Sequence, residues 1–168
     1  MENKKSVLDA YSFALNLLDD YDHDCINKPK GTKDKVKLSY VNCREFIDSM
    51  KYSDTSSVFG VEKEEGKLNG ILSAVYQEVF DQEIYSSLEE KAANLLYFLI
   101  KDHPFADGCK RIGASLFVEY LSRNNMLYRD DKLIISENAL VAITLLIAES
   151  RPEEKENIIR LIMNFLSH

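Results

Sequence analysis

The stretch HPFADGCKRIGASLFVEYL, from His103 to Leu121, joins a charged loop to an apolar helical run. The first amides of a helix lack partners within the helix and carry the positive end of its dipole. Here those amides belong to the residues from Gly108 to Arg111, and the side chains of Lys110 and Arg111 add two positive charges. Backbone N–H groups and cations that converge on one point form a favourable site for phosphate. The stretch therefore predicts an anion hole at the beginning of a helix.

Two further residues of the loop carry chemistry. Asp107 is its only carboxylate, and carboxylate oxygens suit a hard cation such as magnesium. Histidine is the usual general base near neutral pH, so His103 is suited to take a proton from an attacking hydroxyl. Singly, each residue also fits a structural role, because a histidine before a helix and a Lys-Arg pair in a first turn are common without catalysis. Together they predict a base, a metal ligand and a phosphate site in one loop.

The segment HPFADGCKR resembles the signature H-x-F-x-[DE]-[AG]-N-[GK]-R of the Fic/DOC family (filamentation induced by cAMP, death on curing), which joins two helices. The resemblance extends backward through SLEEKAANLLYFLIKD and forward through FVEYLSRNNMLY, more weakly over residues 57–166, and is greatest to the RhuM-type, death-on-curing-like branch. It implies an all-α (mainly α) fold, a Fic-type helical bundle with a small β-hairpin flap. It also implies transfer of a phosphoryl or nucleotidyl (AMPylation-type) group from a nucleotide to a protein hydroxyl.

The resemblance assigns a role to each position of the signature. The general base would be His103, the inward anchor of the loop Phe105, and the metal ligand Asp107. The nucleotide phosphates would lie against Gly108, Cys109, Lys110 and Arg111. The implied cofactors are Mg²⁺ and a nucleotide co-substrate, ATP or a related one. The implied partners are a target protein with a Ser, Thr or Tyr hydroxyl and, for a death-on-curing-like toxin, an antitoxin or inhibitor protein.

Two departures from the signature leave alternatives open. Cys109 replaces the family's Asn, which favours a degenerate member that binds a nucleotide or a partner without catalysis. A thiol at a helix N-terminus can also be a nucleophile, but the phosphatase-like C-x5-R spacing would need Arg where Ser115 stands. Ala114 replaces the second arginine of the adenylylating subgroup, and Lys110 replaces its glycine. This pair favours phosphorylation over adenylylation.

Many relatives are inhibited by a glutamate in the motif [ST]-x-x-x-E-[GN]. The candidates Glu65, Glu137 and Glu156 follow Val61, Leu133 and Pro152 by four residues, so none of them matches. We therefore expect a separate inhibitor protein or a low intrinsic activity.

Length and composition set the outer limits. A chain of 168 residues suits one domain that buries roughly 70% of its unfolded surface. The net charge of −7 disfavours binding to nucleic acid, which is itself negatively charged. Three cysteines without a CxxC pair favour a reducing cytoplasm, and three histidines outside ligand spacing disfavour zinc. No apolar run is long enough to span a membrane.

The N-terminal region is predicted to form a helix over residues 3–20, with Leu8, Tyr11, Leu15 and Leu18 on one face. This face would pack on the core or on a second copy of the chain, giving a homodimer. A loop or linker follows over residues 22–35. We accordingly divide the chain into an N-terminal helix with its linker, 1–35, and a catalytic domain, 36–168.

The remaining elements follow from capping and turn signals. Asn42 is expected to cap a short helix that buries Cys43, Phe46, Ile47 and Met50, and Ser87 begins an S-x-x-E capping box before a helix that is buried nearly all round. Residues 79–87 are expected to form either a hairpin flap beside the active site, turning at Asp81-Gln82, or an ordinary loop. Further signals are a hairpin turn at Asp130-Asp131, a cap at Ser136 and a first-turn proline at Pro152.

Overall fold

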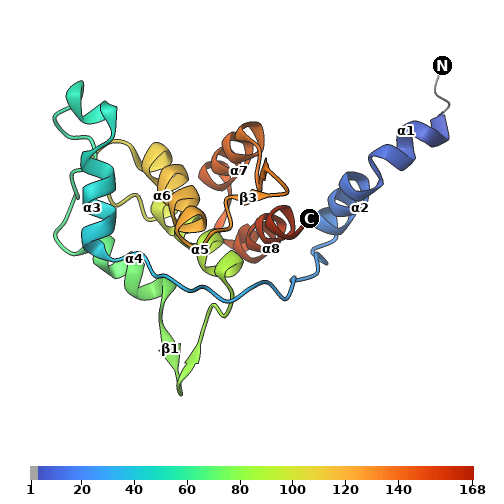
Figure 1. Cartoon of the computed structure of the whole chain (residues 1–168), viewed down its shortest axis with the longest axis horizontal. Coiled ribbons are helices and arrows are strands. Elements are labelled where there is room, and N and C mark those ends of the chain that lie inside the picture. Colours follow the sequence, from blue (N-terminus) through green and yellow to red (C-terminus); the bar gives the residue numbers. More distant parts are fainter. Residues whose placement is uncertain (1–3) are drawn as a thin grey trace.

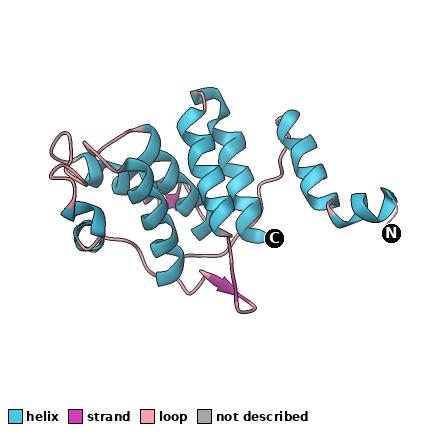
Figure 2. Cartoon of the chain, turned by 90° about the horizontal axis from the view of Figure 1, so that it is seen from above, coloured by secondary structure: helices cyan, strands magenta, loops and turns pink. Residues whose placement is uncertain are grey.

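The computed structural model describes residues 4–168 as a bundle of helices with two small hairpins (Figures 1 and 2). The predicted mainly α fold with a small hairpin is confirmed. The helices are α1 (Lys4–Ala10), α2 (Ser12–Asp22), α3 (Tyr40–Asp48), α4 (Lys67–Val75), α5 (Leu88–Lys101), α6 (Cys109–Arg123), α7 (Glu137–Glu149) and α8 (Lys155–Ser167), with 3-10 turns η1 (Lys51–Asp54) and η2 (Pro152–Glu154). The antiparallel hairpins pair β1 (Glu78–Val79) with β2 (Gln82–Glu83), and β3 (Tyr128–Arg129) with β4 (Lys132–Leu133).

Helix α5 is the centre of the bundle and packs against α4, α6, α7 and α8. From Leu88 to Ile100 every side chain except that of Phe98 is buried, as its apolar sequence predicts. One half of the predicted capping box forms, since Oγ of Ser87 accepts a hydrogen bond from the N–H of Glu90 at 3.1 Å. The carboxylate of Glu90 accepts instead from the N–H of Ser86, at 3.2 Å. Truncating a fully buried leucine such as Leu95 to alanine would cost about 2–5 kcal/mol. This helix therefore gives the loop that follows it a rigid base.

The N-terminal helix differs from the prediction. It is broken at Tyr11 into α1 and α2, and the predicted face of Leu8, Tyr11, Leu15 and Leu18 is exposed. A cavity between α2, α7 and α8 is lined on the α2 side by Phe13, Ala14, Leu17, Leu18 and Tyr21, of which Leu17 is buried. The Phe13 ring stacks on that of His168, with 3.6 Å between centroids. Of the two alternatives expected for this face, packing on the core is not what the structure shows, and α1 extends away from the bundle (Figure 1).

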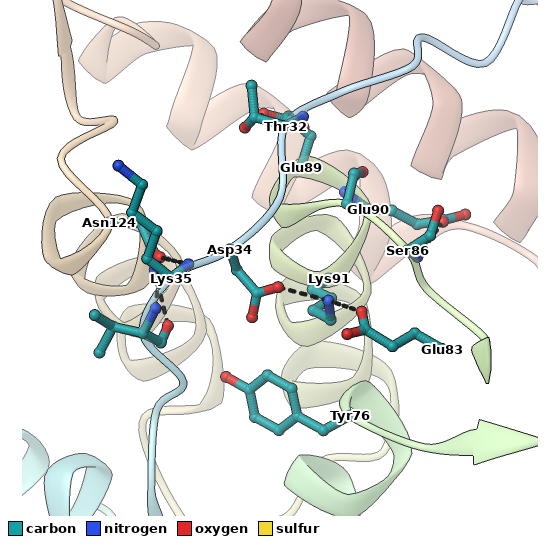
Figure 3. A network of polar contacts seen from close by, with 12 residues as sticks. Thr32, Asp34, Lys35, Tyr76, Glu83, Ser86, Glu89, Glu90, Lys91 and Asn124 are labelled. Atoms are coloured by element: carbon teal, nitrogen blue, oxygen red, sulfur yellow. Dashed lines mark hydrogen bonds and ion pairs between the residues drawn. The ribbon is translucent and has the colours of Figure 1, made fainter. Parts of the chain in front are cut away.

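A strap, residues 24–39, crosses the bundle and is tied to α5 by polar contacts (Figure 3). The Lys91 ammonium is enclosed between the carboxylates of Asp34, at 2.7 Å, and Glu83. The second oxygen of Asp34 accepts a hydrogen bond from the hydroxyl of Tyr120 at 2.9 Å. Thr32 donates to the buried carboxylate of Glu89 through both its N–H and its hydroxyl. One buried cation of α5 thus holds both the strap and the β1–β2 hairpin.

The shorter caps and turns follow the prediction with one exception. Helix α3 is capped by Ser39, whose Oγ accepts from the N–H of Asn42 at 3.1 Å, while Oδ1 of Asn42 accepts from the N–H of Ser39. Ser39 is therefore the N-cap residue, and Asn42 is the third residue of the helix, which completes the capping box. The prediction that Asn42 is the N-cap was wrong. Ser136 caps α7 and Pro152 opens η2, both as predicted.

The β1–β2 hairpin forms within the segment expected for the flap, but it turns at Phe80 and Asp81, with φ of 52° and 63°, one residue earlier than predicted. Its contact with α5 is through Lys91, in the first half of the helix. The signature loop follows Lys101, about 15 Å further along the helix axis. Figure 1 shows the hairpin projecting from the lower edge of the bundle. The expected position of this hairpin beside the site was therefore wrong.

Within residues 4–168, no helix combines the length and apolar character needed to cross a lipid bilayer.

Candidate active site

The signature loop, residues 102–108, connects α5 to α6 and pairs with a distant part of the chain. This bridging segment, residues 59–63, lies three residues before the start of α4. Three backbone hydrogen bonds join them. The N–H of Lys63 donates to the carbonyl of Pro104 at 2.9 Å, and the N–H of Ala106 donates to the carbonyl of Val61 at 2.8 Å. The N–H of Gly60 donates to the carbonyl of Asp107 at 3.0 Å. The loop is thus held by main-chain bonds on one side and by two buried helices at its ends.

Two residues fix the conformation of the loop. The side chain of Phe105 has no exposed surface, so its ring holds the loop onto the core. Gly108 ends the loop with φ of 98°, a left-handed conformation that favours glycine. A Cβ at this position would lie 2.4 Å from a ring carbon of Phe59, so no larger residue fits. The start of α6 is therefore set by glycine geometry and by aromatic packing.

The N-terminus of α6 presents the expected anion-binding amides. The first hydrogen bond of the helix runs from the N–H of Ile112 to the carbonyl of Gly108 at 2.8 Å. The N–H groups of Cys109, Lys110 and Arg111 precede that bond, at the positive end of the helix dipole. The Lys110 side chain is exposed beside them. This arrangement can hold a phosphate.

Arg111 is held by partners on three sides. Its Nη2 lies 3.0 Å from Oδ1 of Asp107. Its guanidinium carbon lies 4.6 Å from the centre of the Tyr52 ring and 5.0 Å from that of Phe59, within range of cation–π attraction. The sequence analysis did not identify the two aromatic residues, which come from η1 and the bridging segment. They orient the arginine beside the site.

Cys109 is turned toward the protein interior. Its side chain is 6% exposed, and Sγ donates a weak hydrogen bond to the carbonyl of Phe105 at 3.4 Å. Burial raises the pKa of this thiol above its ordinary value of 9.0, more than the nearby cations lower it. A nucleophilic cysteine needs a lowered pKa. The geometry therefore argues against Cys109 as a nucleophile, and the group that Cys109 can offer to an anion is its backbone N–H.

A cavity of about 630 Å³ brings the candidate residues together. It is lined by the candidate residues His103, Asp107, Gly108, Cys109, Lys110 and Arg111. Lys101, Ala148 and Glu149, which the sequence analysis did not single out, also line it. The volume is within the usual range for ligands of nucleotide size. His103 lies near the start of the loop, with φ of 50°. Its exposed imidazole has no hydrogen-bond partner among the described residues. The imidazole is accessible to an incoming hydroxyl.

The site also suits magnesium. One oxygen of Asp107 is held by Arg111, and the side chain is 38% exposed and lines the cavity. Mg²⁺ is commonly held by one or two carboxylates together with substrate phosphates and water. Asp107 beside a phosphate site fits that pattern.

Comparison with known proteins agrees with the geometry. No curated protein and no solved structure gives a significant match to the chain. The model of the Fic/DOC family matches residues 40–121, from the start of α3 through most of α6, and so includes the bridging segment and the whole signature loop. Over this segment, just under half of its length, the chain is similar to the Fic/DOC family.

Proposed function

We propose that the protein is a magnesium-dependent transferase that moves a phosphoryl group from ATP or a related nucleotide to a Ser, Thr or Tyr hydroxyl of a target protein. The observation that carries this proposal is the single cavity shared by His103, Asp107 and the N-terminus of α6. It combines a proton acceptor, an oxygen ligand for a cation and an anion-binding helix end. Phosphoryl transfer depends chiefly on positioning and charge stabilisation, which such a cavity provides.

Each residue has a distinct task in this proposal. His103 takes the proton of the attacking hydroxyl. Asp107 holds the metal ion, which neutralises charge on the phosphates. The free amides at the start of α6, with Lys110 and Arg111, bind the group that is transferred. Arg111 acts from a fixed orientation, because Asp107, Tyr52 and Phe59 restrain it.

The choice of phosphoryl over nucleotidyl transfer rests on two residues of α6. Lys110 adds a cation where adenylylating relatives have glycine and need room for the phosphate chain. Ala114, one turn further along the helix, has no charge with which to hold distal phosphates. Both features favour a γ-phosphate at the anion hole and a place in the death-on-curing-like, RhuM-type branch. A toxin controlled by a separate antitoxin or inhibitor protein is the biological role in keeping with that branch.

The test compares γ-labelled with α-labelled ATP, incubated with the protein, magnesium and a cell lysate. Only label that disappears with His103→Ala counts as transfer by this site. We expect a protein band labelled from the γ position. Label that arrives from the α position alone would replace phosphorylation with nucleotidylation and would leave the family unchanged.

A second candidate function is a degenerate member that binds a nucleotide without transferring any part of it. The observation that favours it is the side chain of Cys109, which bonds to Phe105 and not to the anion hole. Binding of ATP by the protein, with no label transferred in the experiment above, is the result that this alternative predicts.

The exposed face of α1 and α2 is the basis for one further part of the proposal, a homodimer through the N-terminal helices. Leu8, Tyr11, Leu15 and Leu18 lie on this face, each at least 45% exposed. Sedimentation of the wild type and of a Leu8→Ser, Leu15→Ser, Leu18→Ser variant tests it. A wild type that sediments as a monomer at micromolar concentration would contradict it.

A further inference from the structure

The cavity has a second wall, which comes from the C-terminal end of α7. Ala148 and Glu149 line it there. Lys101, the last residue of α5, fixes this end of α7, because its Nζ donates to the carbonyl of Ser150 at 2.7 Å and lies 3.5 Å from that of Ala148. The signature loop begins directly after Lys101. The position of Glu149 relative to the loop is therefore set by a direct contact.

The two walls differ in electrostatic character. The α6 wall presents the positive end of a helix dipole with Lys110 and Arg111. The α7 wall presents the carboxylate of Glu149, while the carbonyl of Ser150 after the helix accepts a hydrogen bond from Lys101. Among the described residues, no ion pair or hydrogen bond engages that carboxylate. A ligand that fits both walls has an anionic end, which binds α6, and an end that donates hydrogen bonds, which binds α7. Phosphates would be repelled from Glu149.

We infer that Glu149 accepts hydrogen bonds from the ribose hydroxyls of the bound nucleotide and thereby selects ribonucleotides. The inference rests on the proposed function, because it takes the ligand to be a nucleotide. The vicinal hydroxyls of ribose present two O–H donors, which match the two oxygens of a carboxylate, and acidic residues bind ribose in this way in dinucleotide-binding folds. A 2′-deoxyribose offers one donor fewer. Glu149 is thus a specificity residue on α7, outside the signature and outside the segment that matches the family.

Three other roles for Glu149 make different predictions. If Glu149 were a second magnesium ligand, its removal would abolish the dependence of nucleotide affinity on magnesium. A contact with the amino group of adenine would make the protein distinguish ADP from IDP. A contact with a basic side chain of the target protein would leave nucleotide affinity unaffected by the substitution.

The experiment is calorimetric titration of the full chain with ADP, 2′-deoxy-ADP, 3′-deoxy-ADP and IDP, each with magnesium and with EDTA. We expect the wild type to bind ADP roughly 10- to 100-fold more tightly than 2′-deoxy-ADP, the usual effect of a hydrogen bond to a charged group. Glu149→Ala should bring this ratio close to one while magnesium dependence is retained, and Glu149→Gln should give an intermediate ratio. Glu153→Ala, an exposed glutamate of η2 outside the cavity, is the matched control and should keep the wild-type ratio.

Each contrary result has a definite meaning. A wild type that binds ADP and 2′-deoxy-ADP equally, or a Glu149→Ala variant that keeps the preference, overturns the ribose contact and leaves the proposed function standing. Loss of magnesium dependence or of a preference for ADP over IDP in Glu149→Ala, with the ribose preference retained, overturns it in favour of a metal or base contact. Failure of the wild type to bind any of these nucleotides contradicts the proposed function and this inference together.

Discussion

The Nζ of Lys91 lies 2.7 Å from Oδ1 of Asp34 in the interior of the protein, where the two side chains are 1% and 4% exposed. Glu83 contacts the same ammonium from the hairpin. Removing one member of a buried ion pair costs far more free energy of unfolding than the pair itself contributes, because the remaining charge is left buried without a partner. The relationship therefore predicts large effects from single substitutions.

Lys91→Met should lower the free energy of unfolding by about 3–5 kcal/mol, because it leaves the carboxylates of Asp34 and Glu83 uncompensated. Urea unfolding followed by circular dichroism measures the change. Lys132→Met, at an exposed lysine of the second hairpin, is the control and should change the stability by less than about 0.5 kcal/mol. A Lys91→Met variant as stable as this control would show that the strap and hairpin do not depend on the buried cation.

Asp34 should make the protein sensitive to acid. Burial raises the pKa of its carboxyl, but the hydrogen bonds from Lys91 and Tyr120 outweigh burial, and the pKa lies below its ordinary value of 3.8. Because the folded state holds the proton less tightly than the unfolded state, this stabilisation is present above about pH 4 and is lost as the pH falls through the folded pKa. The test is the urea midpoint of unfolding measured between pH 2 and 7. At the acid end this midpoint should fall less steeply with pH for Asp34→Asn than for the control Asp131→Asn, which changes an exposed aspartate in the β3–β4 turn. Equal slopes would contradict the prediction.

His103→Ala should reduce the rate of transfer by roughly 10²- to 10⁴-fold, the usual contribution of a general base. The melting temperature should stay within a few degrees of the wild type, because the imidazole is exposed and has no partner among the described residues. His23→Ala, at an exposed histidine after α2, should retain full activity. Full activity in His103→Ala would rule out the proposed mechanism.

Cys109→Asn should raise the rate of transfer. An amide donates to the carbonyl of Phe105 more strongly than a thiol does, and it offers an oxygen besides. A stronger bond at this point steadies the first turn of α6, whose amides bind phosphate. Steady-state rates with γ-labelled ATP measure the effect, and Cys109→Ser, with a hydroxyl of similar size, separates hydrogen bonding from bulk. An asparagine variant that is less active than the wild type would mean that the buried pocket is fitted to sulfur.

Features that depend on nearby residues were predicted from the sequence. The caps at Ser87 and Ser136 involve bonds to backbone groups three residues ahead, so they are visible in the local pattern. The β3–β4 turn at Asp130 and Asp131 has φ of 53° and 62°, which aspartate tolerates better than most residues. The burial of α5 follows from its apolar composition.

Features that depend on distant residues were not predicted. The bridging segment belongs to a polar stretch, residues 54–70, that glycines interrupt, so it resembles an ordinary loop until its partners in the signature loop are known. Glu149 is one acidic residue at a helix end, and only the contact of Lys101 with α7 places it at the site. The exposure of Leu15 beside buried Leu17 depends on which face of α2 meets α8, and hydrophobic spacing pointed to the face of Leu15.

The strap lies before the segment that matches the family, and α8 lies after it, yet both pack on α5. A fragment trimmed to residues 40–121 would keep the whole signature and lose Asp34, the partner of Lys91. It would also lose the buried face of α8, including Ile158, Ile162 and Leu166, and would expose the apolar surface of α5 beneath it. We therefore expect the smallest piece of this chain able to fold to be longer at both ends than the segment that is similar to the family.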